Sequence, residues 1–299
     1  MTSTYASDAY IDVDVFQGDV AYLEALFSRQ MVGDDEFPLI DTGQGEPLVF
    51  VPILEHLEFV YARQVYFFSQ RRRVILYRRH ETRVHFTRME QRVEELRDLL
   101  NHLEITSADF VAHGDGAMVL LEFALRYPQR CRSLTIIAQA ADYQIKPHPW
   151  IWLLHELYLR LPVERILPAA FVRRIVVNYI VSRQLHPERG AEDEQLQLLA
   201  RACIESQFEK INAWPAVYKF SVLPIIHNFT IRKRLAGLTM PILLINRFDD
   251  LLAPEDKTHW LAEHLPHCAG YHVIPGGERF FMYSEAARVN QIMQGFLEQ

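Results

Sequence analysis

The 299-residue sequence has few cysteines, no surplus of basic residues and no long apolar run, and each shortage excludes a class of protein. Its three cysteines, Cys131, Cys203 and Cys268, lie far apart and form no CxxC pair, which excludes a disulfide framework and favours a reducing compartment. The net charge of -7 argues against general nucleic-acid binding. No apolar stretch reaches the ~20 residues that span a bilayer, so we do not expect an integral membrane protein.

Targeting, metal and nucleotide-binding patterns are also missing. The first thirty residues carry four aspartates and lack a basic start followed by an apolar run, so we expect a cytoplasmic protein without a secretory signal. Pro266 interrupts the spacing of His259, His264 and His267, and no metal signature results. Neither a P-loop nor a GxGxxG fingerprint appears. We therefore predict no metal site and no cofactor.

Apolar runs of strand length alternate with segments of helical period over much of the chain. Continuous apolar runs are typical of strands that are buried on both faces of a sheet. The predicted strands are Pro47–Ile53, Val74–Tyr77, Ala108–Ala112, Ser133–Ala138, Ile242–Asn246 and Tyr271–Ile274. Between two of them, apolar residues from Met89 to Leu103 recur at intervals of three and four, as in an amphipathic helix. This alternation predicts the α/β class, with a mostly parallel central sheet flanked by helices.

The alternation stops between residues 143 and 238, where the sequence indicates helices rich in aromatic residues and punctuated by prolines. We interpret this stretch as a helical lid inserted into a core made of residues 1–142 and 239–299. Two roles for the aromatic side chains stay open. They either pack between the lid and the core, which is the more common role, or line an apolar ligand pocket under the lid.

The segment from Asp109 to Met118 has the pattern of a nucleophile elbow, with a glycine where the nucleophile belongs. The elbow is a sharp strand-to-helix turn in which small residues flank the nucleophile and let strand and helix approach closely. Ala112 and Gly116 occupy the small positions, and Gly114 lies between them. Glycine has no side chain that can attack a substrate, so the pattern predicts the turn without its nucleophile.

Three segments in this order resemble the α/β-hydrolase superfamily, over a span from about Leu39 to Leu297. They are Pro47–Glu55, the elbow with its following helix Ala117–Pro128, and the end of the chain from Pro241. The resemblance implies the α/β-hydrolase fold with a helical lid. Within the superfamily, short stretches such as Leu48–Pro52 and Phe171–Val176 are similar to maspardin-like proteins. Such proteins are thought of as noncatalytic, cytosolic binders of partner proteins.

The same resemblance implies a degenerate catalytic triad, as in a pseudoenzyme. The acid position falls on Asp250, four residues before Pro254, and is retained. The nucleophile position falls on Gly114, and the histidine position falls on Arg279. In the oxyanion loop, Pro52 has no N–H to offer to a developing negative charge. Of the expected triad only the acid is kept, and it is a remnant.

Further candidate site residues lie close to the predicted strand ends. Apolar Ile53 and Leu54 follow the first long strand, and His113 precedes the elbow glycine and is expected to pack within the sheet. Arg78 and Arg79 follow the second long strand, where such sheets bind ligands. These five residues are our pocket candidates.

The charged candidates each allow two interpretations. The arginines after the second strand, among them Arg78 and Arg79, either bind an anionic ligand or, as charge runs usually do, form a solvated face. Arg279 either pairs with Asp250 and ties two loops together or anchors an anion. Asp115 is a weak candidate for an attacking carboxylate or a base, because it lies one position after the elbow glycine.

Three functions from different classes remain open. The first is a noncatalytic protein that binds a small apolar or anionic ligand or a protein partner, which accounts for all the lost positions together. The second is a nonhydrolytic enzyme, such as a lyase, isomerase or cyclase, that uses the pocket under the lid. The third is a hydrolase in which a displaced histidine or aspartate activates water.

Overall fold

The computed structural model describes residues 13–32, 35–142, 149–180, 205–227, 229–248, 250, 252–275 and 280–299. Its centre is an eight-stranded sheet of order β1-β2-β4-β3-β5-β6-β7-β8. The strands are β1 (Ser28–Val32), β2 (Asp35–Thr42), β3 (Pro47–Val51), β4 (Arg73–Tyr77), β5 (Ala108–His113), β6 (Cys131–Ile137), β7 (Ile242–Arg247) and β8 (Cys268–Ile274). Strands β3 to β8 pair in parallel, while β1 and β2 pair antiparallel. The prediction of a mostly parallel sheet is confirmed.

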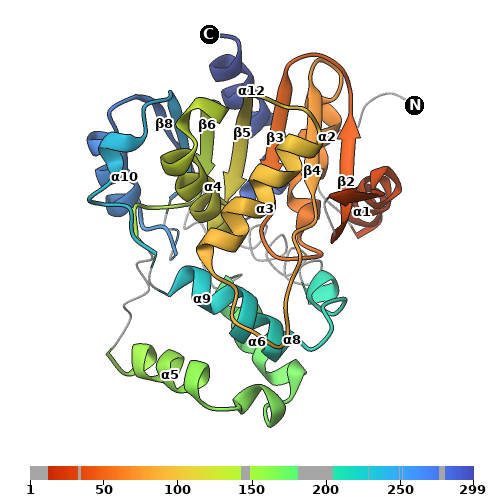
Figure 1. Cartoon of the computed structure of the whole chain (residues 1–299), viewed down its shortest axis with the longest axis vertical. Helices are drawn as coiled ribbons and strands as arrows, with labels where there is room; N and C mark the ends of the chain where they lie inside the picture. Colours follow the sequence, from red (N-terminus) through yellow and green to blue (C-terminus); the bar gives the residue numbers. More distant parts are fainter. Residues whose placement is uncertain are drawn as a thin grey trace.

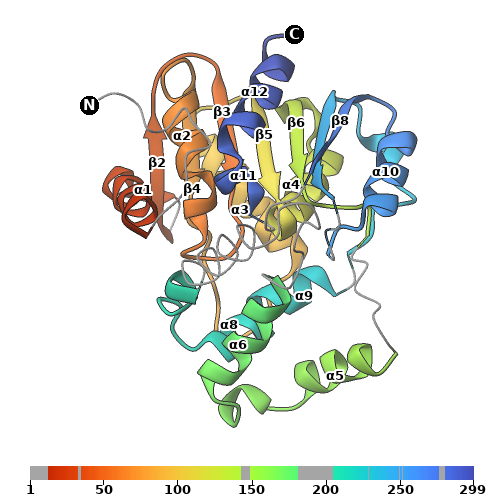
Figure 2. The same ribbon diagram turned by 180° about the vertical axis from the view of Figure 1, so that it is seen from behind.

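Helices cover both faces of this sheet. The helices of the described residues are α1 (Val13–Leu26), α2 (Ala62–Phe68), α3 (Met89–His102), α4 (Gly114–Arg126), α5 (Pro149–Arg160), α6 (Ala169–Ile180), α8 (Trp214–Val217), α9 (Leu223–Ile226), α10 (Glu255–His264), α11 (Phe281–Ser284) and α12 (Ala286–Leu297). Helices α3 and α4 pack on one face (Figure 1), and α2, α11 and α12 pack on the other (Figure 2). Each face thereby buries its own apolar cluster.

The buried strands account for the continuous apolar runs of the sequence. Every residue of β5 and β7 is buried, and four of the five residues of β3 and of β4 are. All six predicted strands are present, although the run from Pro47 leaves the sheet after Val51 and not after Ile53. Burial on both faces leaves no polar face, so these strands lack the alternating pattern.

Strands β1 and β2 were not predicted. They form an antiparallel hairpin at one edge of the sheet, with Ser28 opposite Leu39 and Val32 opposite Asp35. Polar residues interrupt β1, and polar residues and Pro38 interrupt β2. β1 is the outer strand, with one neighbour and an exposed side, so it has no need for a continuous apolar run, whereas β2 lies between β1 and β4.

Between β6 and β7 the described chain forms helices joined by turns and loops, with an isolated β-bridge between Asp142 and Thr230 and no strand of the sheet. Helices α5, α6, α8 and α9, together with the π-helix η5 (Tyr218–Val222), lie beyond the carboxyl ends of the parallel strands (Figures 1 and 2). The boundaries of the lid at residues 143 and 238 stay a prediction. Helical elements at this edge nevertheless face the sheet end where the candidate site residues lie.

Candidate functional site

A sharp turn joins β5 to α4 and contains the elbow glycine. His113, the last residue of β5, has extended backbone angles, and Gly114, the first residue of α4, has a φ of +55°. Residues with a Cβ rarely adopt positive φ, because the Cβ then lies too close to the backbone. The chain thus forms the predicted turn, and it places a glycine in the conformation that the turn requires.

Close approach of α4 to the end of β3 accounts for the second small residue of the elbow. A Cβ on Gly116 would lie 2.7 Å from the carbonyl oxygen of Pro52 and 2.8 Å from that of Val51. Both neighbours are backbone atoms, which cannot move aside as a flexible side chain can. Gly116 therefore lets the helix pack directly against the strand end, as the elbow pattern predicts.

Replacing Gly114 with serine is expected to lower the free energy of unfolding by about 1 kcal/mol, because a Cβ is strained at a φ of +55°. Thermal unfolding of parent and variant measures the change. Gly295→Ser is the matched control, because a Cβ there meets nothing within 4 Å and its φ is not positive. A Gly114→Ser protein that melts at or above the parent temperature would contradict the expectation.

Tyr61 connects the elbow to the first parallel strand. Its hydroxyl accepts a hydrogen bond from the backbone N–H of His113 at 2.9 Å and donates one to the carbonyl oxygen of Val51 at 3.2 Å. Burial raises the pKa of Tyr61 well above its ordinary value, so the hydroxyl keeps its proton. The His113 side chain is 1% exposed, with its ring centroid 5.5 Å from that of Phe280. His113 thus packs inside the core, as expected.

The two apolar pocket candidates lie in the core on the same side of the sheet. Ile53 and Leu54 are 3% and 5% exposed and belong to an apolar cluster that also contains Phe59 and Phe280. This cluster surrounds the loop that follows β3. Whether Ile53 and Leu54 line a ligand pocket stays a prediction.

Asp115, the residue after the elbow glycine, faces a buried arginine. Its Oδ2 lies 2.7 Å from Nη1 of Arg79, an ion pair that lies off the ideal hydrogen-bond axis. Burial lowers the pKa of Arg79, but the carboxylates of Asp115 and Glu81 outweigh burial and hold that pKa above its ordinary value. The Arg79 charge is therefore permanent, and it engages the carboxylate that was a candidate nucleophile or base.

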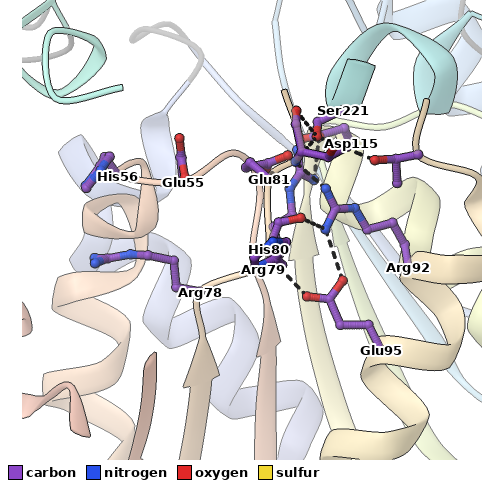
Figure 3. Close-up of polar contacts among 12 residues, drawn as sticks. Glu55, His56, Arg78, Arg79, His80, Glu81, Arg92, Glu95, Asp115 and Ser221 are labelled. Carbon is purple, nitrogen blue, oxygen red and sulfur yellow. Dashed lines mark hydrogen bonds and ion pairs between the residues drawn. The ribbon is translucent and has the colours of Figure 1, made fainter. Parts of the chain in front are cut away.

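Glu81 lies between two buried arginines (Figure 3). It pairs with Nε of Arg79, and its Oε2 lies 2.8 Å from Nη2 of Arg92. Arg92 also donates to the carbonyl oxygen of His80 at 2.6 Å and to Glu95 at 3.0 Å. Burial raises the pKa of Glu81, but Arg79 and Arg92 outweigh burial and hold that pKa below its ordinary value. These contacts form a network of alternating positive and negative side chains that begins at Asp115 in the elbow.

The loop after β4 also connects the core to the helices beyond the strand ends. The hydroxyl of Ser221 accepts a hydrogen bond from the N–H of Thr82 at 2.8 Å and donates one to the carbonyl oxygen of Thr82 at 3.1 Å. The N–H of Thr87 donates to the carbonyl oxygen of Phe220 at 2.7 Å. Residues 82–87 are thus held against η5, and the charge network lies immediately before them in the chain.

The solvated-face interpretation of the arginines after β4 is wrong for Arg79, which is 3% exposed. Arg78 is largely buried and pairs with Glu58 at 3.0 Å and with Glu24 at 2.8 Å. Arg83 pairs with Glu55 at 2.5 Å. These acids come from segments far from the arginines in sequence, so the charges of Arg78 and Arg83 are neutralised on folding. The sequence contained one local signal of this pairing that was overlooked, namely Glu81, an acid two residues after Arg79.

Asp250 lies buried in the loop after β7, where it is 3% exposed. Its Oδ1 accepts hydrogen bonds from the backbone N–H groups of Leu252 at 2.8 Å and Ala253 at 2.9 Å. Arg279, its predicted partner, lies outside the described residues. Sequence reasoning also overlooked Arg247, the last residue of β7, which is 5% exposed. An arginine that ends a buried apolar strand was the available signal.

Comparisons with known proteins agree with this arrangement of strands and turns. No family model matches the chain. The enol-lactonase from Burkholderia xenovorans LB400 superposes with a TM-score of 0.69 at 18% identity, covering 91% of this chain and 100% of that one. A thermophilic esterase from Thermogutta terrifontis superposes with a TM-score of 0.69 at 17% identity, covering 91% of this chain and 98% of that one. This chain has the α/β-hydrolase fold.

Sequence relatives of this chain are named as hydrolases and esterases. The chain is 25% identical over 210 residues to the uncharacterized hydrolase YcgS of Bacillus subtilis (strain 168), covering 67% of this chain and 72% of that protein. It is 25% identical over 153 residues to the pimeloyl-[acyl-carrier protein] methyl ester esterase of Nitrosomonas europaea, covering 50% of this chain and 56% of that protein. These relatives are named as hydrolases or esterases, whereas this chain has Gly114 in its elbow.

The α/β-hydrolase fold brings most of the predicted site residues to one edge of the sheet. Ile53, Arg79, Gly114 and Asp250 follow the carboxyl ends of β3, β4, β5 and β7. No helix in the described part of the chain is both long enough and apolar enough to cross a bilayer.

Proposed function

We propose that this chain is a noncatalytic α/β-hydrolase-fold protein, a pseudoenzyme that binds a ligand or a protein partner without hydrolysing it. The observation that carries the proposal is Gly114, which occupies the elbow at a φ of +55° and offers no nucleophilic atom. A side chain at this position would be strained, so glycine suits a turn that is kept for its shape.

Three other features of the site support the proposal. The carboxylate of Asp115 is engaged by Arg79, and Oδ1 of Asp250 is engaged by the backbone of its own loop. Pro52, at the end of β3, has no N–H with which to stabilise an oxyanion. The nucleophile and the oxyanion loop therefore both depart from what serine hydrolysis needs, although the acid position is kept.

The charges near the elbow favour an apolar ligand over an anionic one. Arg78 and Arg79 are both paired with carboxylates, so they leave no surplus positive charge for an anion. Burial, reinforced by the charge of Arg78, lowers the pKa of His56 to about 4, so this histidine is neutral at neutral pH. Ile53 and Leu54 supply apolar surface on the loop after β3. We therefore propose that an apolar small molecule, or an apolar segment of a partner, occupies the site.

The closer resemblance to maspardin-like proteins supports the same proposal. It rests on short stretches such as Leu48–Pro52 and Phe171–Val176, and it would make a protein partner the ligand. A cytoplasmic location belongs to this proposal too, because the few, scattered cysteines suit a reducing compartment.

The purified protein is expected to stay unlabelled by a fluorophosphonate probe and to leave a panel of p-nitrophenyl esters intact, because it has no elbow nucleophile. An active serine esterase of the same fold is the positive control. Stoichiometric labelling of any serine, or ester hydrolysis that the probe abolishes, would refute the proposal.

Mass spectrometry of small molecules incubated with the protein separates binding from other chemistry. Retention of an apolar compound without any product is the expected result. Turnover that is lost in Asp250→Asn or Asp115→Asn would instead identify a nonhydrolytic enzyme and would overturn the noncatalytic assignment. Asp98→Asn is the control for these variants, because Asp98 is an exposed residue on α3, away from the elbow.

A further inference from the structure

Exposed apolar side chains are concentrated on the helices beyond the strand ends. Of twelve large apolar side chains that are exposed in the described part of the chain, seven lie between Leu153 and Ile175. They come from α5, from the turn η4 (Val163–Arg165) with its flanks, and from the start of α6. Scattered exposed apolar residues are ordinary, but a concentration of this kind marks a contact surface.

The geometry of α5 makes one of its faces apolar. Leu153, Leu157 and Leu161 are spaced four residues apart and so share one face; they are 52%, 42% and 48% exposed. The other side of the helix faces the protein. There the Tyr158 hydroxyl donates to the carbonyl oxygen of Pro215 at 2.8 Å. Tyr158 and Leu159 pack against the core, so α5 carries apolar side chains on its inner side and a second apolar face that points away from the core.

Arginines outnumber acids on this surface, with four against two between residues 149 and 180. Arg160 and Arg165 have side chains that are 77% and 82% exposed, and they lie 3.0 Å from Glu156 and 3.7 Å from Glu164. The acids between residues 149 and 180 are Glu156 and Glu164, whose side chains are only 20% and 9% exposed. Glu156 lies 2.9 Å from His227, and Glu164 lies 2.7 Å from Lys219. Each acid is therefore shared between an exposed arginine and a second basic side chain, and the outer surface combines leucines with a surplus of arginines.

This surface lies at one pole of the molecule. Figure 1 shows α5, η4 and the start of α6 together at the end opposite the C-terminus. A flat partner can therefore reach α5 without meeting the sheet domain. We name the surface of α5, η4 and the start of α6 the apolar lid face.

Charge complementarity decides between two occupants. A second copy related by a two-fold axis would place the apolar lid face against itself, with arginine opposite arginine. An anionic lipid surface satisfies both components, since leucines enter the boundary of the acyl chains while guanidinium groups pair with lipid phosphates. The chain has a net charge of -7, so an anionic surface would repel most of the protein. Contact is therefore favoured through the face that carries the local positive charge.

We propose that the apolar lid face binds the surface of an anionic lipid bilayer, so that the protein associates peripherally with a membrane through its lid helices. The leucines of α5 supply the apolar contact, and Arg160 and Arg165 supply the attraction to phosphate. Association by this face places the carboxyl ends of the strands, and the elbow with them, toward the membrane.

Sedimentation with lipid vesicles tests the proposal. The protein is expected to bind vesicles of phosphatidylcholine that contain about 30% phosphatidylglycerol, to bind pure phosphatidylcholine vesicles much less, and to dissociate as salt is raised. Leu153→Ser combined with Leu157→Ser is expected to weaken partitioning by at least about tenfold, because the bilayer then no longer buries these two leucine side chains. Arg160→Gln and Arg165→Gln are each expected to weaken it by about fivefold.

Met31→Ser is the matched control, because Met31 is 57% exposed but lies on β1, away from the lid. It should bind vesicles as the parent does. Absence of vesicle binding by the parent, or equal binding by the leucine and arginine variants, would overturn the proposal. So would a dimer in solution that the leucine substitutions dissociate. A large loss of melting temperature in the leucine variant would also overturn it, because the chain itself would then cover the face.

Discussion

Replacing Glu81 with alanine is expected to lower the free energy of unfolding by about 3 kcal/mol. Glu81 is 4% exposed and lies between Arg79 and Arg92, which are each 3% exposed. Without its carboxylate, two buried guanidinium groups lose a partner that water cannot replace. Residual partners, Asp115 for Arg79 and Glu95 for Arg92, keep the loss at the lower end of what breaking a buried pair costs.

Urea titration followed by circular dichroism measures this loss. Asp98→Ala is the control, since Asp98 pairs with Arg97 at the surface and its side chain is 52% exposed, so a change within about 0.5 kcal/mol is expected. Glu81→Gln keeps one acceptor oxygen and should lose less than the alanine variant. A Glu81→Ala protein as stable as the parent would show that the network does not form.

Glu81 should also make stability depend on pH. Because Arg79 and Arg92 outweigh burial and hold its folded-state pKa below its ordinary value of 4.5, the unfolded chain takes up its proton first as the pH falls. The stabilisation is therefore fully present above the ordinary pKa and is lost as the pH falls through the lowered one. The difference in unfolding free energy between the parent and Glu81→Gln should shrink in acid. A difference that stays constant would contradict the lowered pKa.

Replacing Asp19 with alanine is expected to cost about 3–5 kcal/mol of stability. Asp19 lies on α1, is 2% exposed, and its Oδ2 lies 2.9 Å from Nε of Arg63. The hydroxyl of Tyr283 donates to the same oxygen at 2.6 Å, and the Arg63 guanidinium lies 4.8 Å from the centre of the Tyr283 ring. Loss of the carboxylate leaves a buried, unpaired arginine and loosens the contact of α1 with α2 and α11.

Thermal and urea unfolding measure this second loss, and a double variant sharpens it. Asp19→Ala combined with Arg63→Met removes both charges and should recover most of the stability, because the penalty comes from the unpaired guanidinium. Glu36→Ala is the control, because Glu36 and Arg29 form an exposed pair worth at most about 1 kcal/mol. A double variant as unstable as Asp19→Ala would show that the loss comes from packing and not from charge.

Most of the parallel sheet could be predicted from local patterns. A strand that is buried on both faces, such as β5 or β7, must be apolar along its whole length, and that requirement is visible without knowledge of its neighbours. The hairpin of β1 and β2 was not predicted, because the outer strand β1 has no such requirement and because polar residues and Pro38 interrupt the apolar run of β2. The elbow was also predictable, since Gly114 and Gly116 meet a conformational and a steric demand within a few residues of each other.

The charged residues of the candidate site could not be assigned in the same way. In the sequence, Arg78 belongs to a run of basic residues. In the fold, its charge is neutralised by Glu58 and by Glu24, which lies fifty-four residues before it. Ser221 reads as one serine among many, yet it holds the loop after β4 through Thr82, across 139 positions in sequence. Such pairs depend on which surfaces meet after folding, and no periodic pattern in the sequence predicts them.

The sequence by itself determined the alternating core, the turn at Gly114 and the lack of a nucleophile there, because each depends on residues close together in the chain. Only the tertiary structure decided that Arg79 forms buried ion pairs and that α5 exposes Leu153 and Leu157 while its one acid, Glu156, pairs with His227. The physical reason is the distance along the chain over which each effect acts. Backbone strain and strand burial act over a few residues, whereas the partner of a charge is set by the packing of distant segments.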